Sequence, residues 1–406
     1  MAASSQSPVG VGATGLAPGA ASATAGPATD RAGLVARRRL VVKIGSSSLV
    51  DPAGHFAPAL LAELTDALAE YIKAGHQVVV VSSGAQAAGL DETAGSSKRP
   101  KTLAQAQAAA SVGQGRLMAA YTAAFGTWDM IVGQVLLTAE DTIRRTHYRN
   151  ALRVLGELLH RGIVPIVNEN DAVATDEIRF GDNDRLAALV AHLVRADGLI
   201  LLTDVDALYD APPTRPGAKP IREVVSFSQI ESLEVTGRGS MVGTGGMVTK
   251  VQAAAMATSS GIPVLLASAG QVRSALAGQP EVGTFFRATG RRLTARRMWL
   301  GYAASMKGVL TVDDGAARAI TEGKKSLLAV GVTAVLGDFE AGDPVEIRAS
   351  DGLVLARGLA GFAAPELAAI RGLSQTEIAA RLGQARAHPA VHRDELVTQA
   401  RSRRPG

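Results

Sequence analysis

Cysteine is absent from the 406-residue sequence, which excludes disulfides, thiolate metal sites and a cysteine nucleophile. Histidine is scarce, with seven residues that do not cluster, so neither a structural zinc site nor a Ser-His-Asp triad is expected. Aromatic residues make up only 4% of the chain, so its cores must be built from aliphatic side chains. No apolar run approaches the roughly 20 residues that span a membrane.

Several familiar signatures are also missing. The sequence contains neither a P-loop motif nor the glycine fingerprint of a Rossmann fold, and no protein-kinase signature set. Residues 1–30 consist of Ala, Gly, Ser, Thr and Pro with few other residues, and lack the basic start and apolar centre of a signal peptide. We therefore expect a disordered extension at this end, a cytoplasmic location and no membrane contact.

Composition divides the chain into two domains. The expected parts are a disordered extension (1–36), an α/β domain (37–286), a basic linker (287–298), a small mostly-β domain (299–385) and a C-terminal tail (386–406). Strand-like apolar runs alternate with helical patterns in the α/β part, which predicts an open, mostly parallel sheet sandwiched by helices. The expected strands are Leu40–Ile44, Gln77–Val81, Met130–Leu136, Ile163–Val167, Gly198–Leu202 and Pro263–Ala267.

Shorter alternating runs follow the basic stretch and indicate the second domain. Strands are expected at Val309–Val312, Ala329–Val332, Pro344–Arg348 and Leu353–Leu359, with helices at Asp314–Glu322 and Gln375–Leu382.

Polar residues gather where strands of the first domain end, which is where open α/β sheets bind ligands. Lys43 lies inside an apolar strand, where its charge needs a partner, and Gly45 and three serines follow it. The other strand ends read VVVSSG (79–84), NENDAV (168–173) and LLTD (201–204), and a glycine loop, GTGGMVTK (243–250), places a second lysine at the start of a helix. Each feature alone is more often a turn than a ligand site. Together they predict a site for a phosphorylated anion.

These motifs, in this order and with GDND at 181–184, resemble the glutamate 5-kinase branch of the amino-acid kinase family. Residues 299–385, with VDDGAARAI and GDFEAGD, resemble the PUA domain that many bacterial members carry. Two departures from the usual pattern are Ala207, where the family commonly has Gly, and Ala329, where it commonly has Pro.

The resemblance implies the amino-acid kinase fold and transfer of phosphate from ATP, with Mg²⁺, to the side-chain carboxylate of L-glutamate, the first step of proline synthesis. The implied catalytic residues are Lys43, Lys250 and Asp184. The implied ATP-binding residues are Lys43, Gly45, Thr203, Asp204, Thr244, Gly245, Gly246, Met247, Val248, Thr249 and Lys250. The implied substrate-binding residues are Ser83, Asp171, Asn183, Asn168 and Asn170, and no metal ligand is assigned.

The resemblance further implies a homo-oligomer and feedback inhibition by L-proline, with resistance substitutions expected in Gln134–Asn150. Two alternatives stay open. One is a sibling kinase acting on N-acetylglutamate, aspartate, carbamate or UMP, which NENDAV and the PUA-like part disfavour. The other is RNA binding through the PUA-like part and the basic run, which the shortness of that run and its lack of aromatics disfavour.

Overall fold

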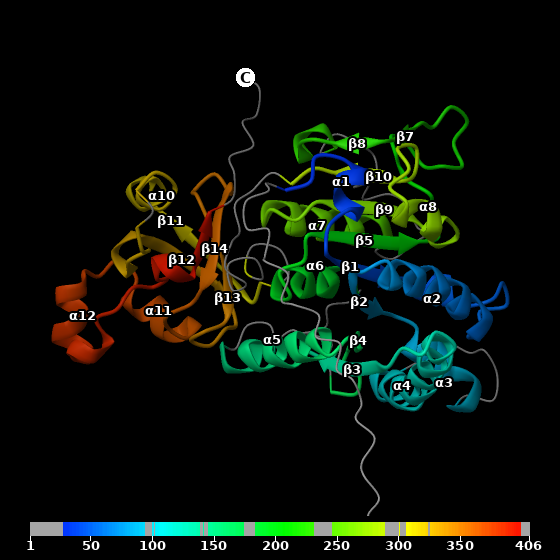
Figure 1. Cartoon of the computed structure of the whole chain (residues 1–406). Helices are drawn as coiled ribbons and strands as arrows, with labels where there is room; N and C mark the ends of the chain where they lie inside the picture. The colour runs from blue at the N-terminus through cyan, green and yellow to red at the C-terminus, as the bar shows by residue number, and fades with distance from the viewer. Residues whose placement is uncertain are drawn as a thin grey trace, which may run out of the picture.

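The computed structural model describes residues 27–93, 100, 102–138, 141, 145–173, 183–230, 246–288, 300, 306–323 and 325–398. These residues form a larger α/β part and a smaller, mostly β part beside it (Figure 1). The predicted fold class is confirmed. Most of the expected linker lies outside the described residues.

The larger part is built on an eight-stranded sheet with the order β3-β4-β2-β1-β5-β9-β10-β8. All six expected strands are present, and they pair in parallel. They are β1 (Arg39–Ile44), β2 (Gln77–Ser82), β3 (Val132–Leu137), β4 (Val164–Glu169), β5 (Gly198–Thr203) and β9 (Val264–Ser268). Two short strands, β8 (Glu223–Val224) and β10 (Thr284–Phe286), extend the sheet, and β10 runs antiparallel to β9. A separate two-stranded ribbon joins β6 (Leu208–Tyr209) to β7 (Pro220–Ile221).

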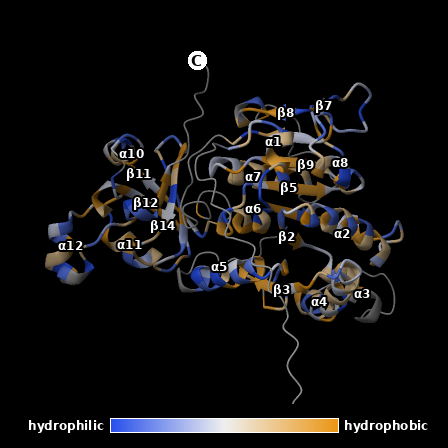
Figure 2. Cartoon of the chain, in the orientation of Figure 1, coloured by the Kyte–Doolittle hydropathy of each residue, from blue (hydrophilic) through white to orange (hydrophobic). Residues whose placement is uncertain are grey.

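Helices cover both faces of this sheet. One face packs against α5 (Arg145–His160), α6 (Asn183–Leu193) and α7 (Gly246–Ser259). The other packs against α1 (Arg31–Val35), α2 (Pro58–Lys73), α4 (Leu103–Gly126) and α8 (Val272–Leu276). Figure 2 shows β5 and β9 among the most hydrophobic segments, whereas α5 is largely hydrophilic. This contrast follows from burial, because a strand covered on both faces needs apolar side chains on each.

The alternation of side chains along the strands decides which face each polar residue meets. Val41 of β1 belongs to the core under α6, whereas Leu40 and Val42 belong to the core under α4. Because strand side chains alternate with a period of two, Lys43 shares the α6 face with Val41. By the same alternation Asn168 of β4 shares the α4 face with Ile166.

Two glycines bring α3 (Ala85–Thr93) and α4 into backbone contact. A Cβ at Gly89 would lie 1.9 Å from the carbonyl oxygen of Ala109, and one at Gly113 would lie 1.7 Å from that of Ala85. Only glycine allows such an approach, so the two helices cross as closely as helices can. Gly89 and Gly113 thereby set how near α3 and α4 lie to each other.

Residues before 37, where the α/β domain was expected to start, already pack against that domain. Helix α1 is capped by Asp30, whose side chain accepts from the Gly33 N–H at 2.7 Å, and Leu34 is fully buried. Arg31 donates to three backbone carbonyls, those of Val282 (2.7 Å), Arg222 (2.6 Å) and Gly283 (3.1 Å). These contacts tie the start of the chain to the far edge of the sheet, so residues 28–36 belong to the domain.

The smaller part is a five-stranded sheet with the order β12-β11-β13-β14-β15. Its strands are β11 (Gly308–Val312), β12 (Val332–Gly337), β13 (Pro344–Arg348), β14 (Val354–Leu359) and β15 (Leu396–Thr398). The helices are α10 (Asp314–Thr321), α11 (Ala364–Ile370) and α12 (Gln375–Leu382), so both expected helices are confirmed. The strand expected at Ala329–Val332 is wrong, because 329–331 is a 3-10 turn and β12 starts at Val332.

The smaller part also extends beyond residue 385, where a tail was expected. Strand β15 pairs antiparallel with β14, Val391 is fully buried, and the His388 ring stacks on Phe362. The β14–β15 edge of this part meets the larger one, since Leu300 and Leu359 join the core under α5, α6 and α7 and Val397 packs against it.

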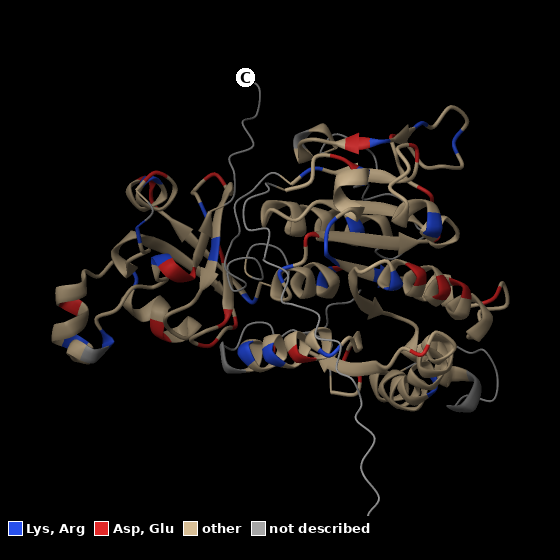
Figure 3. Ribbon diagram, in the orientation of Figure 1, with Lys and Arg blue, Asp and Glu red and all other residues tan. Residues whose placement is uncertain are grey.

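Charges are mixed over both parts, with several basic residues along α5 (Figure 3). Among the described residues no helix combines the length and the apolarity needed to cross a bilayer.

Candidate active site

A cavity of about 870 Å³ opens at the carboxyl ends of the parallel strands. Its size falls in the ordinary range of small-molecule sites. It is lined by Lys43, Gly45, Ser46, Ser47, Val50, Ser83, Gly84, Ala85, Gln86, Ala87, Leu90, Pro100, Ala106, Asn168, Glu169, Asp171, Asn183, Thr203, Asp204, Gly246 and Lys250.

A carboxylate held between two lysines forms the floor of this cavity. Lys43 Nζ lies 2.7 Å from Asp184 Oδ1, and Lys250 Nζ lies 3.1 Å from Asp184 Oδ2. Asp184 is fully buried, and the two lysines are 2% and 7% exposed. Two ammonium groups against one carboxylate leave a net charge of one positive unit, which suits the site to an incoming anion.

Local structure explains why Asp184 holds this position. It is the second residue of α6, where the positive end of the helix dipole favours a carboxylate. Thr249 Oγ1 donates to Asp184 Oδ2 at 3.0 Å, and Lys250 Nζ also donates to the Gly246 carbonyl at 3.0 Å. The start of α7 thus supplies Lys250, the Gly246 carbonyl that accepts from it and the Thr249 hydroxyl that donates to Asp184.

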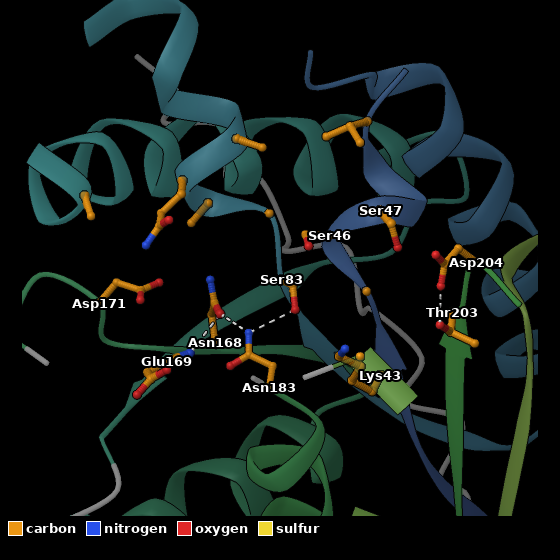
Figure 4. Close-up of a pocket in the computed structure, with 18 of the residues that line it drawn as sticks. Lys43, Ser46, Ser47, Ser83, Asn168, Glu169, Asp171, Asn183, Thr203 and Asp204 are labelled. Atoms are coloured by element: carbon orange, nitrogen blue, oxygen red, sulfur yellow. Dashed lines mark hydrogen bonds between the residues drawn. The ribbon is translucent and has the colours of Figure 1, made fainter. Parts of the chain in front are cut away.

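A chain of amide side chains forms a second wall. Asn183 Nδ2 lies 2.6 Å from the Ser82 carbonyl oxygen, 2.7 Å from Asn168 Oδ1 and 3.2 Å from Ser83 Oγ. Asn168 Oδ1 also accepts from the Glu169 N–H at 2.8 Å. Figure 4 shows these side chains grouped on one side of Lys43, with Asp171 beyond them.

The end of β2 is held by a hydrogen bond to α4. Ser82 Oγ lies 2.8 Å from the hydroxyl of Tyr121, which is fully buried on α4. Burial raises the pKa of Tyr121, so its hydroxyl stays protonated. Gly84 has φ +94°, a conformation that favours glycine, and it lets α3 start directly at the cavity.

Thr203 and Asp204 lie on the opposite side of Lys43 from the amides (Figure 4). Thr203 Oγ1 donates to Asp204 Oδ1 at 2.8 Å. Within the described part of the chain, no three His, Cys, Asp or Glu residues are grouped to hold a metal ion. Asp204 and Glu169 line the cavity singly, which suits an ion such as Mg²⁺ that proteins bind through one or two carboxylates and a substrate's phosphates.

The loop after β3 carries an ordered carboxylate outside the cavity. Asp141 Oδ2 accepts from the backbone N–H and the hydroxyl of Thr138 at 2.7 and 2.8 Å, and its Oδ1 lies 2.7 Å from His147 Nδ1. Partial burial acts to raise the pKa of Asp141, but these hydrogen bonds outweigh it, so the pKa lies below its ordinary value of 3.8.

Most residues that the sequence nominated meet at this site. Those lining the cavity are Lys43, Gly45, Ser83, Asn168, Asp171, Asn183, Thr203, Asp204, Gly246 and Lys250. Asp184 lies beneath it, and Thr249 supports Asp184. Thr244 and Gly245 lie outside the described residues.

Besides Asp184 and Thr249, three other nominated residues that the structure describes do not line the cavity. Met247 packs against the core, and Val248 is 37% exposed. Asn170 is also absent from the lining, because β4 ends at Glu169 and the Asn170 N–H donates to the Leu137 carbonyl instead.

Other residues at the cavity had no assigned role in the sequence. Gln86 and Leu90 of α3, Ala106 of α4 and Glu169 of β4 all line it. The helix that opens at Gly84 was the signal for the α3 residues, whereas α4 reaches the site only through its tertiary contact with α3.

Comparison with known proteins gives this geometry a family. The model of the "Amino acid kinase family" matches residues 38–268, more than half of the chain, and that of the "PUA domain" matches 308–382. A glutamate 5-kinase of Streptomyces coelicolor is 55% identical over 361 residues, which is 89% of this chain and 96% of that protein. A glutamate 5-kinase of Cutibacterium acnes is 53% identical over 374 residues, or 92% and 95% of the two chains.

A solved structure of a Giardia carbamate kinase aligns with 62% of this chain and 99% of its own, at 18% identity and a TM-score of 0.46. Because the glutamate 5-kinase relatives are more than half identical to this chain over nearly their full length, the chain belongs to the amino acid kinase family, on its glutamate 5-kinase branch, and carries a PUA domain after the kinase domain.

Proposed function

We propose that this enzyme transfers the γ-phosphoryl group of ATP to the side-chain carboxylate of L-glutamate, giving L-glutamyl 5-phosphate in the first step of proline biosynthesis. The observation that carries the proposal is the buried Lys43–Asp184–Lys250 group at the cavity floor, with an amide wall on one side and Thr203–Asp204 on the other. The names of the relatives support glutamate as the substrate.

The chemistry requires no proton transfer. A glutamate side chain titrates near pH 4.3, so its carboxylate is already ionised and is itself the nucleophile. One carboxylate oxygen forms a bond to the γ-phosphorus while the bond from that phosphorus to the β,γ-bridging oxygen breaks, and ADP leaves. The scarcity of histidine at the site agrees with a reaction that needs no base.

The obstacle is charge, because an anion must approach a polyanion. Preorganised positive groups at the transferring phosphoryl group are the usual solution in phosphoryl transfer. We assign this role to Lys43 and Lys250, which Asp184 holds in place without cancelling their charge. Mg²⁺ bound with ATP would add positive charge on the phosphates, with Asp204 and Glu169 as the available carboxylates.

Substrate recognition is assigned to the amide side of the cavity. Asp171 would receive the α-ammonium group of glutamate, and Ser83, Asn168 and Asn183 would bind the rest of the amino-acid head. Proline shares that head but has no side-chain carboxylate, so we propose that it inhibits the enzyme by occupying the same residues. We also propose a homo-oligomer, and we assign no RNA-binding role to the PUA domain.

The test is ATP-dependent formation of glutamyl phosphate, trapped as its hydroxamate. Glutamate is compared with N-acetylglutamate, aspartate and carbamate, and we expect glutamate to be the preferred acceptor. Asp171→Asn should raise KM for glutamate much more than KM for ATP. Preference for another acceptor would refute the proposed substrate, and equal increases in both KM values would place Asp171 at the metal rather than at the amine.

A further inference from the structure

Gln114 touches the substrate side of the site from outside the cavity. It lies on α4 beside Gly113, is half buried, and does not line the cavity. Its Oε1 accepts a hydrogen bond of 2.8 Å from Asn168 Nδ2. Gly113, the preceding residue, makes the close backbone contact between α3 and α4.

The hydrogen bonds of the two asparagines have a fixed direction. The Glu169 N–H can only donate, so it requires the oxygen of Asn168 on its side. The Ser82 carbonyl can only accept, so it requires the Asn183 amide nitrogen. Both amides are therefore oriented by the backbone, and Asn168 Nδ2 is left facing α4, where it needs an acceptor.

Two side-chain atoms of this hydrogen-bonded group are buried without a hydrogen-bond partner among the described residues, Gln114 Nε2 and Asn183 Oδ1, and only Asn183 lines the cavity. Buried polar atoms are rarely left unpaired, so an acceptor of this kind at a cavity indicates a donor on the ligand. The α-ammonium group of an amino acid is such a donor.

We propose that Gln114 is a positioning residue for the amino-acid substrate, an inference that rests on the proposed function. By accepting the hydrogen bond of Asn168 Nδ2, it keeps Asn168 Oδ1 in contact with the Asn183 amide nitrogen. Asn183 Oδ1 is then directed at the substrate's ammonium group. Gln114 touches neither substrate, and its effect passes through Asn168.

The test compares Gln114→Met with Gln114→Glu by steady-state kinetics in the full-length enzyme. Methionine keeps the length of the side chain but removes the acceptor. Glutamate keeps an acceptor oxygen, and the Nε2 that it removes has no hydrogen-bond partner within the described part of the chain. We expect Q114M to raise KM for glutamate about tenfold, as for loss of one hydrogen bond, with KM for ATP changed less than twofold. Q114E should lie within threefold of the parent.

Two controls separate positioning from a general structural effect. Gln105→Met makes the same chemical change at an exposed position of α4 and should leave both KM values unchanged. In the double variant Q114M/N168A, KM for glutamate should equal that of N168A alone, because Gln114 acts only through Asn168.

Equal increases of both KM values, a Q114E variant as impaired as Q114M, or effects that multiply in the double variant would each overturn the inference. An inactive parent would instead refute the proposed function, whereas an active parent with an unchanged Q114M would refute the inference alone.

Discussion

Replacing Asp184 with asparagine removes the carboxylate that lies between Lys43 and Lys250. The side chain keeps its shape, but the two ammonium groups lose the carboxylate oxygens that lie 2.7 and 3.1 Å from them. Breaking a buried ion pair by removing one partner typically costs about 3–5 kcal/mol, because the remaining charge is left desolvated.

The variant can limit this cost by releasing a proton. Lysine titrates near pH 10.4 in water, so deprotonating one ammonium group at pH 7 costs about 4–5 kcal/mol. The loss of folding free energy in D184N therefore cannot exceed about 4–5 kcal/mol at this pH. In that case the folded variant binds fewer protons than its unfolded chain, and its stability rises with pH. The gap to the parent should shrink by about 1.4 kcal/mol for each pH unit, or roughly 2–3 kcal/mol between pH 7 and pH 9.

Urea unfolding of the parent and D184N at pH 7, 8 and 9 measures the difference in their free energies of unfolding and its change with pH. The matched control is Glu157→Gln, which removes a carboxylate from an exposed pair with Arg161 at 2.6 Å and should cost at most about 1 kcal/mol at every pH. A D184N variant that unfolds within 1 kcal/mol of the parent at pH 7, with no change at pH 9, would show that the two lysines do not depend on Asp184.

Three further outcomes are expected. Gly113→Ala should lower the melting temperature and raise KM for glutamate, because the added Cβ would collide with the α3 backbone. A Cβ at Gly115 would have no atom within 4 Å, so Gly115→Ala should stabilise α4 by about 0.5–1 kcal/mol. Calorimetry compares the melting temperatures of the two variants. Arg31→Met should cost about 3 kcal/mol in urea unfolding, since three backbone carbonyls lose a charged donor, and a loss below 1 kcal/mol would contradict the anchoring role of α1. Asp141→Ala should cost about 1 kcal/mol at pH 7. Because the folded-state pKa of Asp141 is lowered, that stabilisation is present above pH 3.8 and is lost as the pH falls further, so parent and variant should converge in acid titrations.

The sequence was most informative where one physical rule dominates. Strands covered on both faces are short runs of Val, Ile and Leu that can be recognised in the sequence, and all six expected strands are present. Lys43 stood out because a charge in such a strand needs a partner, and the period of the strand placed it on the face where α6 supplies Asp184. That Lys250 meets the same carboxylate does not follow from the residues alone, because it depends on how α6 and α7 pack; the family resemblance had implied that Asp184 orients the two lysines or the metal.

Features held by distant contacts were missed. Helix α1 has five residues and gains its stability from Arg31, whose partners lie far away in the chain. Strand β15 is three residues long, too short for any alternation to be seen. Asn170 was expected at the cavity through the NENDAV resemblance, yet it is not among the lining residues, and its backbone N–H donates to the Leu137 carbonyl; its part in substrate binding stays a prediction. Gln114 lies in an Ala-rich helix, and its partner is 54 residues away.

The contacts of Arg31 also bear on how the chain folds as it is synthesised. Helix α1 leaves the ribosome long before the carbonyls that it binds, which lie up to 252 residues later in the chain. At about 5–20 residues per second, translation needs roughly 10–50 s to make them. During that time Arg31 lacks carbonyl partners, and β1 lacks its neighbour β5 until residues 198–203 have been made. Helix α1 is thus made early but completes its contacts late, and a ribosome that pauses before residue 282 holds a kinase domain in which Arg31 lacks two of its three carbonyl partners.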